Sequence, residues 1–309
     1  MIVQATMTTR GQGWGVFYAV LGTVFWGFSG AAVQYAFGSL NVQPLWLVGV
    51  RLLGAGLLLL GWFAVSDWRH FFDVWRRPRH AVQLVVFALL GMIPSQLTYF
   101  LSIHYGNAAT ATVLQFTGPL FIVLYFALAK RQWPRRVDGI AIILAVVGTV
   151  LVVTKGHLTG LALAPLAVFW GLLAGVSQAS YTLLPRELLA TFDARLVVGW
   201  AMLVGSVPFM PLLVQTGLPH FSLGGIATIL FIVVVGTMFA YLLYLKSLKY
   251  ISATATGMLS ACEPLTATVM TVLLLGTQVS FVEGIGGCLI LATVFLQAMG
   301  GRQSGMSGE

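Results

Sequence analysis

The sequence predicts an all-α integral membrane protein in which ten transmembrane helices form two inverted five-helix repeats. Three observations lead to this fold class: the composition, the distribution of basic residues and an internal repeat. The 309 residues are 59% hydrophobic and only 8% charged, with a mean hydropathy of +0.94. A soluble domain carries about 25% charged residues. This chain therefore lacks the polar side chains that a water-facing surface requires.

Ten apolar runs are long enough to cross a bilayer, whose hydrocarbon core of about 30 Å needs roughly 20 residues of helix. The predicted spans are 14–37, 44–66, 81–102, 107–130, 136–154, 161–184, 196–216, 223–246, 252–274 and 280–300. The connectors are short apart from 67–80, so no soluble domain is expected. The first run is longer than the hydrophobic core of a signal peptide and lacks a cleavage motif, so we expect it to be retained.

Basic residues set the orientation of the spans, because Lys and Arg are enriched in cytoplasmic loops. With the N-terminus in the cytoplasm, the inner side receives fourteen of the sixteen Lys and Arg residues. The outer side receives only Lys155, and Arg51 lies within the second span. We therefore expect a multi-pass protein of the cell (inner) membrane with both termini in the cytoplasm. The net charge of +8 reflects this topology and indicates no nucleic-acid partner.

Motifs for cofactors and catalysis are missing from the sequence. Cys262 and Cys288 lie inside apolar runs, so neither a disulfide framework nor redox or metal chemistry is indicated. The chain contains no ATP-binding G-x-x-x-x-G-K-[ST] motif, no H-E-x-x-H and no G-x-S-x-G. We therefore expect no cofactor, no metal site and no catalytic residue.

An internal repeat relates the two halves of the chain. The tetrapeptide VFWG occurs at 24–27 and again at 168–171, 144 positions later, and from 91 to 151 a second copy follows at a constant offset of 145. The matched residues include Tyr99, Ser102, Tyr105 and Pro119, which pair with Tyr244, Ser247, Tyr250 and Pro264. Each copy holds five spans, and because five is odd, the second copy enters the membrane from the opposite side.

The repeat sets the expected domain organisation. Residues 1–155 are expected to form the first repeat, residues 156–301 the second, and residues 302–309 a cytoplasmic tail. Halves of similar structure and opposite orientation can exchange conformations, which gives inward-open and outward-open states of similar energy.

The two copies resemble the repeats of the EamA-type drug/metabolite transporter superfamily. The resemblance rests on the FWG opening, on Arg51 in the second span, on the Y…S..Y..A.A run that leads into a mid-helix proline, and on the Gly-rich last helix. It extends over the chain outside the tails and implies a transporter of amino acids, other metabolites or drugs. Many such repeats carry an acidic residue just after the fourth helix. This chain reads AKRQW and LGTQV there, so no role of that acid is transferred.

Glu263 is the clearest candidate for chemistry, because it lies near the middle of the ninth span, directly before Pro264. An ionisable group in hydrocarbon costs about 2.5–3.5 kcal/mol and therefore needs a partner or a function. Two interpretations stay open: a ligand for a substrate ammonium group or for a coupled proton, and a carboxyl group that satisfies backbone donors near the proline. The repeat partner of Glu263 is Gly118, so this charge breaks the symmetry.

Arg51 is expected to have a structural role, with its long side chain reaching the membrane interface from the second span. Binding of a substrate carboxylate is the alternative.

Polar residues recur at helical spacing in the fourth and ninth spans. They are Thr112, Gln115 and Pro119 in one span and Thr256, Ser260 and Glu263 in the other. A polar stripe on an apolar helix is expected to face a cavity, and hydrogen bonding between helices is the alternative. Pro119 and Pro264 each free a backbone carbonyl and allow bending, so we interpret both as hinges.

Aromatic residues with polar neighbours share helix faces in three other spans, the third, the sixth and the eighth. Besides the two stripes, the candidate binding residues are Trp26, Gln96, Tyr99, Trp170, Ser177, Gln178, Tyr181, Tyr241 and Tyr244. Aromatic walls with a few polar groups suit an amphipathic small molecule, and ordinary packing is the alternative for each. The small residues that follow the two tryptophans, among them Gly30 and Gly175, are expected at close helix contacts.

These features predict a secondary transporter that exports small amphipathic metabolites, such as aromatic or hydrophobic amino acids, by alternating access. The alternatives are an exporter of drugs or organic cations and a translocator of lipid-linked metabolites with the same fold. An intramembrane enzyme is disfavoured because no nucleophile with a base and no metal cluster is found. The expected partners are the substrate, the lipid bilayer and a proton if transport is coupled, and the chain is expected to act as a monomer or weak homodimer.

Overall fold

The computed structural model describes residues 9–129, 136–155, 163–217, 222–247, 250–251, 256 and 259–303, and every regular element in this part of the chain is helical. The first half contains α1 (Thr9–Gly38), α2 (Pro44–Asp67), η1 (Trp68–His70), α3 (Pro78–Phe87), η2 (Ala88–Met92), α4 (Ile93–Tyr105), α5 (Ala108–Gln115), α6 (Gly118–Ala129) and α7 (Arg136–Thr154). The second half contains α8 (Pro165–Leu183), α9 (Arg186–Thr191), α10 (Ala194–Ser206), η3 (Val207–Phe209), α11 (Met210–Thr216), α12 (Leu223–Leu230), η4 (Phe231–Phe239), α13 (Ala240–Ser247), α15 (Cys262–Leu275) and α16 (Phe281–Gln303).

Six helical segments of the described residues are long and apolar enough to cross a membrane. They are Gln12–Gly38, Pro44–His70, Pro78–Tyr105, Pro165–Thr191, Ala194–Thr216 and Leu223–Tyr244. Three shorter apolar helices accompany them: Gly139–Thr154, Cys262–Leu275 and Phe281–Thr293. The chain is thus an all-helical, multi-pass membrane protein, and the number of ten spans stays a prediction.

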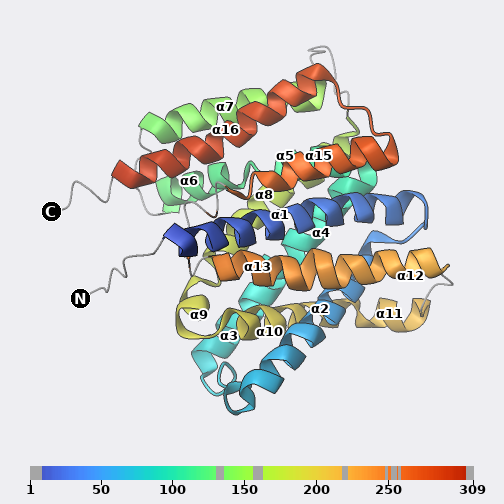
Figure 1. Ribbon diagram of the computed structural model, residues 1–309, viewed down its shortest axis with the longest axis vertical. Coiled ribbons are helices and arrows are strands. Elements are labelled where there is room, and N and C mark those ends of the chain that lie inside the picture. The colour runs from blue at the N-terminus through green and yellow to red at the C-terminus, as the bar shows by residue number, and fades with distance from the viewer. Residues whose placement is uncertain are drawn as a thin grey trace.

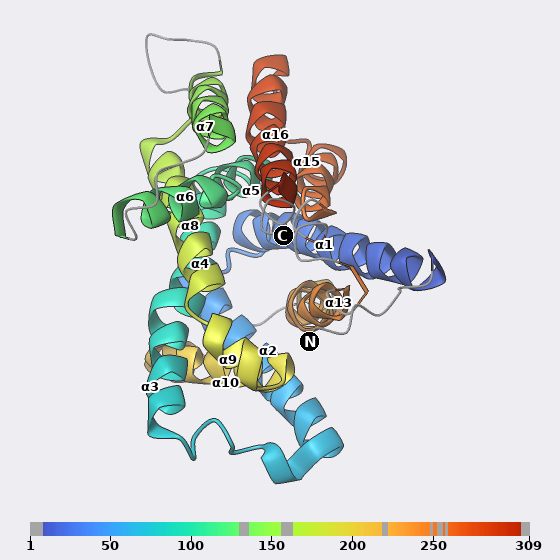
Figure 2. The same ribbon diagram turned by 90° about the vertical axis from the view of Figure 1, so that its left-hand side faces the viewer.

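The helices of the two halves pack against one another in reciprocal pairs. The last helices, α7 and α16, lie side by side (Figures 1 and 2), and α2 packs along α10. The first helix of each half contacts the helices that correspond to the third and fourth predicted spans of the other half. Thus α1 packs on η4, α13 and α15, while α8 packs on η2, α4, α5 and α6. A two-fold exchange of the halves would produce this pattern.

Glycines allow the first helices to approach their neighbours closely. A Cβ on Gly27 of α1 would lie 2.7 Å from the carbonyl oxygen of Glu263 and 2.9 Å from the amide nitrogen of Ala267, both on α15. At Gly30 an added Cβ would lie 2.7 Å from the Tyr99 hydroxyl, and at Gly175 it would overlap the hydroxyl of Thr117. The close contacts predicted at Gly30 and Gly175 are therefore confirmed.

The predicted fourth and ninth spans are not the continuous, bent helices that the hinge interpretation implies. The fourth is broken at Phe116 and Thr117, between α5 and α6, and the ninth turns at Ser260 and Ala261 before α15 begins. Each break lies two to four residues before a proline, whose missing N–H deprives a carbonyl of the preceding turn of its donor. In the repeat register of 145 residues the two breaks lie within one residue of each other.

The third segment of each half contains a π-helical stretch, η2 and η4. In the repeat register residues 88–92 of η2 correspond to residues 233–237 of η4, so both halves widen the helix at the same place. π-helical turns are rare and often occur at functional sites.

Candidate functional site

A polar cavity lies between seven helices drawn from both halves of the protein. The first half lines it with Trp26, Ser29, Arg51, Ser95, Gln96, Tyr99 and Gln115. The second half adds Gln178, Tyr181, Tyr241 and Glu263. The cavity is partly open to the surroundings, and the space between atoms within it, open solvent included, amounts to about 510 Å³.

Arg51 contributes the positive charge of the cavity. Its side chain is only 5% exposed, and its Nη2 donates to the carbonyl oxygen of Gly236 over 3.2 Å. Its guanidinium carbon lies 5.2 Å from the centroid of the Phe100 ring. The prediction that Arg51 reaches the membrane interface is therefore wrong. The side chain points into the bundle, where the π-helical segment η4 offers it oxygen acceptors.

Glu263 contributes the negative charge, from the first turn of α15. The N-terminus of a helix favours an anion, because its backbone N–H groups point outward without intrahelical partners. The backbone N–H of Glu263 donates to the carbonyl oxygen of Ser260 over 2.9 Å, across the break that precedes α15. The helix break therefore presents the carboxylate to the cavity.

Uncharged polar groups line the same cavity. The Gln115 amide on α5 donates to the Oε1 of Gln178 on α8 over 3.2 Å, which joins the two halves. Within the described residues, the Oε1 of Gln115 and the hydroxyl of Ser29 are buried without a hydrogen-bond partner. A buried acceptor without a donor is costly, so these two oxygens are suited to receive hydrogen bonds from a bound molecule or water.

Aromatic side chains form one wall of the cavity. The Trp26 ring on α1 lies 5.1 Å from both the Tyr241 and the Tyr244 ring of α13, with the Tyr241 ring edge-on. The Tyr181 ring of α8 lies 6.1 Å from the Tyr241 ring. Such a wall offers a planar or cationic group a large apolar contact with a negative π face.

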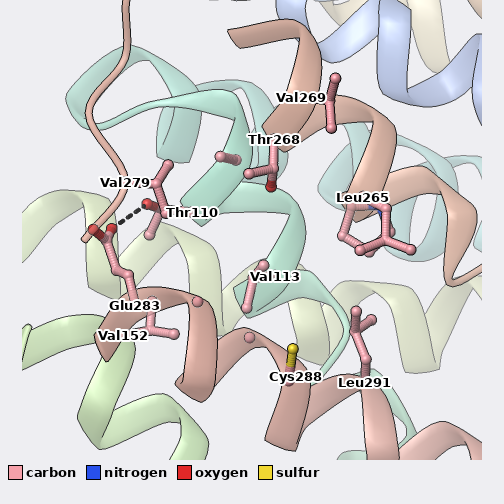
Figure 3. A pocket seen from close by; sticks show the side chains of 14 residues that line it. Thr110, Val113, Val152, Leu265, Thr268, Val269, Val279, Glu283, Cys288 and Leu291 are labelled. Carbon is pink, nitrogen blue, oxygen red and sulfur yellow. Dashed lines mark hydrogen bonds between the residues drawn. The ribbon is translucent and has the colours of Figure 1, made fainter. Parts of the chain in front are cut away.

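A second cavity lies outside this polar one, between α5, α7, α15 and α16 (Figure 3). Its walls are almost entirely apolar, with Val113, Leu265 and Leu291 among them. Its one carboxylate, that of Glu283, is already engaged, since it accepts a hydrogen bond from Thr110 over 3.3 Å (Figure 3). The polar cavity is therefore the better candidate for binding a polar substrate.

Glu283 also belongs to a polar cluster that joins the halves at one end of the bundle. Its Oε2 lies 3.1 Å from the Nζ of Lys155 and 3.1 Å from the backbone N–H of Ser280. The Ser280 hydroxyl in turn accepts a hydrogen bond from the backbone N–H of Glu283, which makes a capping box at the start of α16.

The side chain of Gln34 on α1 makes a second link. Its amide nitrogen donates to the Thr277 hydroxyl, and its amide oxygen accepts from the backbone N–H of Ala108.

The sequence matches the model of the EamA-like transporter family over residues 13–154 and again over residues 165–299. The chain belongs to this family. The protein is an EamA-family transporter, and the resemblance seen in its repeats is confirmed.

Proteins that are similar in sequence to this EamA-family transporter include named transporters. An uncharacterized inner membrane transporter, YicL of Salmonella typhimurium, is 35% identical over 94% of this chain and 96% of its own length. The threonine/homoserine exporter RhtA of the same species is 30% identical over 72% of this chain and 74% of its own. A solved structure titled "Crystal structure of protein" has a TM-score of 0.61 at 16% identity, with 96% of this chain and 98% of that chain covered, and shares the fold.

The cavity of this EamA-family transporter gathers eight of the predicted binding residues. They are Trp26, Gln96, Tyr99, Gln115, Gln178, Tyr181, Tyr241 and Glu263. Thr112 and Tyr244 lie one contact away: the Thr112 hydroxyl is 2.9 Å from that of Tyr99, and the Tyr244 ring packs on Trp26.

The other predicted residues do not line the cavity. Trp170 and Ser177 lie on α8, where the Trp170 ring packs on Phe169 and Ser177 is buried. Ser260 lies at the helix break before α15. Pro264 lines the apolar cavity instead, and the side chain of Pro119 on α6 lies outside the described residues.

Three cavity residues were not predicted as binding residues: Ser29, Arg51 and Ser95. Ser29 is one of the small residues after Trp26, which the sequence predicts at close helix contacts, and Arg51 is the residue expected at the membrane interface. For Arg51 the sequence did offer a signal, because it is a charged residue within an apolar span.

Proposed function

We propose that this protein is a secondary transporter of the inner membrane that exports small amphipathic metabolites, such as hydrophobic or aromatic amino acids. The observation that carries the proposal is the cavity that both halves line, in which one carboxylate, that of Glu263, stands beside an aromatic wall. An ammonium group pairs with the carboxylate, while an apolar side chain packs on the wall. The names of RhtA, an amino-acid exporter, and of YicL, an inner membrane transporter, agree with it.

Alternating access between inverted halves is the proposed mechanism. It is supported by the reciprocal helix contacts and by the two helix breaks at corresponding positions. Discontinuous helices at the interface of two repeats are typical of substrate sites in secondary transporters. In the proposed topology both termini are cytoplasmic, and the first turn of α1 lies at the same end of the bundle as the last turn of α16 (Figure 1).

An exporter of organic cations is the second candidate function, because the Trp26 and Tyr241 rings beside Glu263 also suit a cation without a carboxylate. A translocator of lipid-linked phosphates needs more than one fixed cation, and in the described residues Arg51 is the one cation that lines the polar cavity.

Counterflow into proteoliposomes tests the proposal. The purified protein is reconstituted, loaded with one unlabelled compound at a time from a panel of amino acids and organic cations, and assayed with and without a pH gradient. We expect accumulation driven by hydrophobic or aromatic amino acids and none in protein-free liposomes. Accumulation with organic cations alone would favour the second candidate, and accumulation with no member of the panel would reject both substrate classes.

A further inference from the structure

We infer that Arg51 and Glu263 form a two-point site for a zwitterion, in which Arg51 binds the substrate carboxylate and Glu263 binds its ammonium group. This inference rests on the proposed function and narrows it, because it separates amino acids from organic cations. Both residues line one cavity, Arg51 from α2 of the first half and Glu263 from α15 of the second.

Arg51 and Glu263 share the cavity without a direct ion pair between them. No salt bridge joins Arg51 to Glu263 in the part of the chain that the structure describes, although four other ion pairs of Lys or Arg with a carboxylate occur there. Charges buried away from bulk water, where the effective dielectric constant is low, attract counter-ions strongly. A zwitterion satisfies both at once, whereas an amine or a carboxylic acid leaves one of them unmatched.

Two hydrogen bonds hold the Arg51 side chain in place and leave other N–H donors of its guanidinium unused. Its Nε donates to the Thr237 hydroxyl over 2.5 Å and its Nη2 to the Gly236 carbonyl. Within the described residues its Nη1 has no hydrogen-bond partner, so three of the five N–H groups are left for a ligand, two on Nη1 and one on Nη2. A planar guanidinium with fixed Nε and Nη2 suits a carboxylate better than a mobile ammonium would.

Unpartnered oxygens complete the site for the ammonium group, which has three N–H donors and needs three acceptors. The Glu263 carboxylate supplies one, and the Gln115 Oε1 is a buried acceptor in the same cavity. The Ser29 hydroxyl, 2% exposed and without a partner in the described part of the chain, is another. The Gln115 and Ser29 oxygens are an observation separate from the Arg51 and Glu263 charges, and they also indicate a ligand with several hydrogen-bond donors.

The test compares each amino acid with derivatives that lack one charge. Phenylalanine, leucine and threonine are each used beside their amides, which lack the carboxylate, and their N-acetyl forms, which lack the ammonium group. Half-saturation in proteoliposome counterflow is measured for wild type, Arg51→Gln, Arg51→Lys and Glu263→Gln. Arg195→Gln is the matched control, because Arg195 pairs with Asp193 away from the cavity.

We expect wild type to prefer the zwitterion over its amide and its N-acetyl form by about 10- to 100-fold, the effect of losing a charge-assisted hydrogen bond. Arg51→Gln should abolish the preference over the amide, because it should weaken transport of the amino acid much more than transport of the amide. Arg51→Lys should restore the preference in part, and Arg195→Gln should keep it.

Equal half-saturation for amino acid and amide in wild type would overturn the zwitterion site, while the proposed function would stand. An equal loss of amino acid and amide in Arg51→Gln would also overturn it, since it would mean a structural role. Size-exclusion profiles of the purified variants show whether each folds, and Arg51→Lys provides the comparison if Arg51→Gln does not. Transport of none of the nine compounds would overturn the zwitterion site and the amino-acid substrate class together.

Discussion

The Nε of Arg51 on α2 lies 2.5 Å from the hydroxyl oxygen of Thr237, which belongs to the π-helical segment η4 of the other half. The Thr237 hydroxyl itself donates to the carbonyl of Ile232 over 2.8 Å, five residues back, as the π-helical winding allows. The widened helix thus turns a hydroxyl and a carbonyl toward the only cation of the described cavity lining. The position of Arg51 depends on the geometry of η4.

Thr237→Val should impair the selectivity of transport rather than transport as a whole. Valine keeps the shape of threonine but removes the acceptor for the Arg51 Nε. We expect the preference for an amino acid over its amide to fall about threefold to tenfold, as for one lost hydrogen bond of roughly 0.5–1.5 kcal/mol. Thr237→Ser keeps the hydroxyl and should restore the preference. A Thr237→Ser variant as unselective as Thr237→Val would contradict this role.

Glu263→Gln should lower transport of amino acids by about 10- to 100-fold with unchanged expression, because the amide keeps the size of the carboxyl but loses its charge. If Glu263 also exchanges a proton with the substrate, the variant should lose the pH dependence of transport. Counterflow measured from acidic to alkaline pH checks both statements. Wild-type kinetics of the variant across this range would rule out a role of Glu263 in binding and in coupling.

Pro264→Ala should slow turnover while leaving substrate affinity unchanged. Alanine restores an N–H that can bond to the Ser260 carbonyl, so the helix would continue through the break before α15. We expect the maximal counterflow rate to fall about threefold or more, as for a slowed conformational step. Pro44→Ala is the control, because Pro44 is the first residue of α2, where a missing N–H is tolerated. Equal rates in both variants would remove the hinge role.

Gly27→Ala should lower thermal stability by separating α1 from α15. The new methyl group would lie within 3 Å of two backbone atoms of α15, which cannot move as a flexible side chain can. Overpacking of this kind costs about 1–3 kcal/mol. Gly13→Ala, in the same helix with nothing within 4 Å, is the control and should be neutral or stabilising. Differential scanning fluorimetry in detergent compares their apparent Tm, and equal values would show that α1 and α15 adapt easily.

Lys155→Met should lower the apparent Tm, because it leaves the buried Glu283 carboxylate, 6% exposed, without its cation. The cost should stay below the roughly 3–5 kcal/mol of a fully buried pair, since the Lys155 side chain is 29% exposed. Adding Glu283→Gln removes the unpaired charge and should recover part of the loss. A double variant that melts at or below the temperature expected from adding the two single effects would show that the pair is not coupled.

The positions of the helices could be predicted from the sequence because a bilayer demands apolar runs of a minimum length. The six long span candidates overlap predicted spans, with ends that differ by at most seven residues. The helix breaks were not predicted, since a proline indicates a lost hydrogen bond but not whether the helix bends or stops. The π-helical segments were not predicted either, because no residue pattern distinguishes them from an ordinary apolar helix.

Within the candidate site, helical spacing identified Gln96 and Tyr99 of α4 as neighbours on the face that lines the cavity. The same reasoning failed for Arg51. Its position along α2 can be read from the sequence, but the direction in which its side chain points cannot. That direction depends on η4, which is distant in the sequence and offers the acceptors. Trp170 was predicted as a binding residue because the repeat relates it to Trp26. Of the two, Trp26 lines the cavity and Trp170 does not.

The reciprocal helix contacts divide the bundle into two kinds of interface under alternating access. Exchanging the halves maps α7·α16 and α2·α10 onto themselves, so a substitution there should affect inward- and outward-open states alike. Exchange turns the α1·α15 interface into that of α8 with α5 and α6. Loosening one of these while leaving the other intact should favour one state, so substitutions at Gly27 or Gly175 provide a way to trap the transporter facing either side of the membrane.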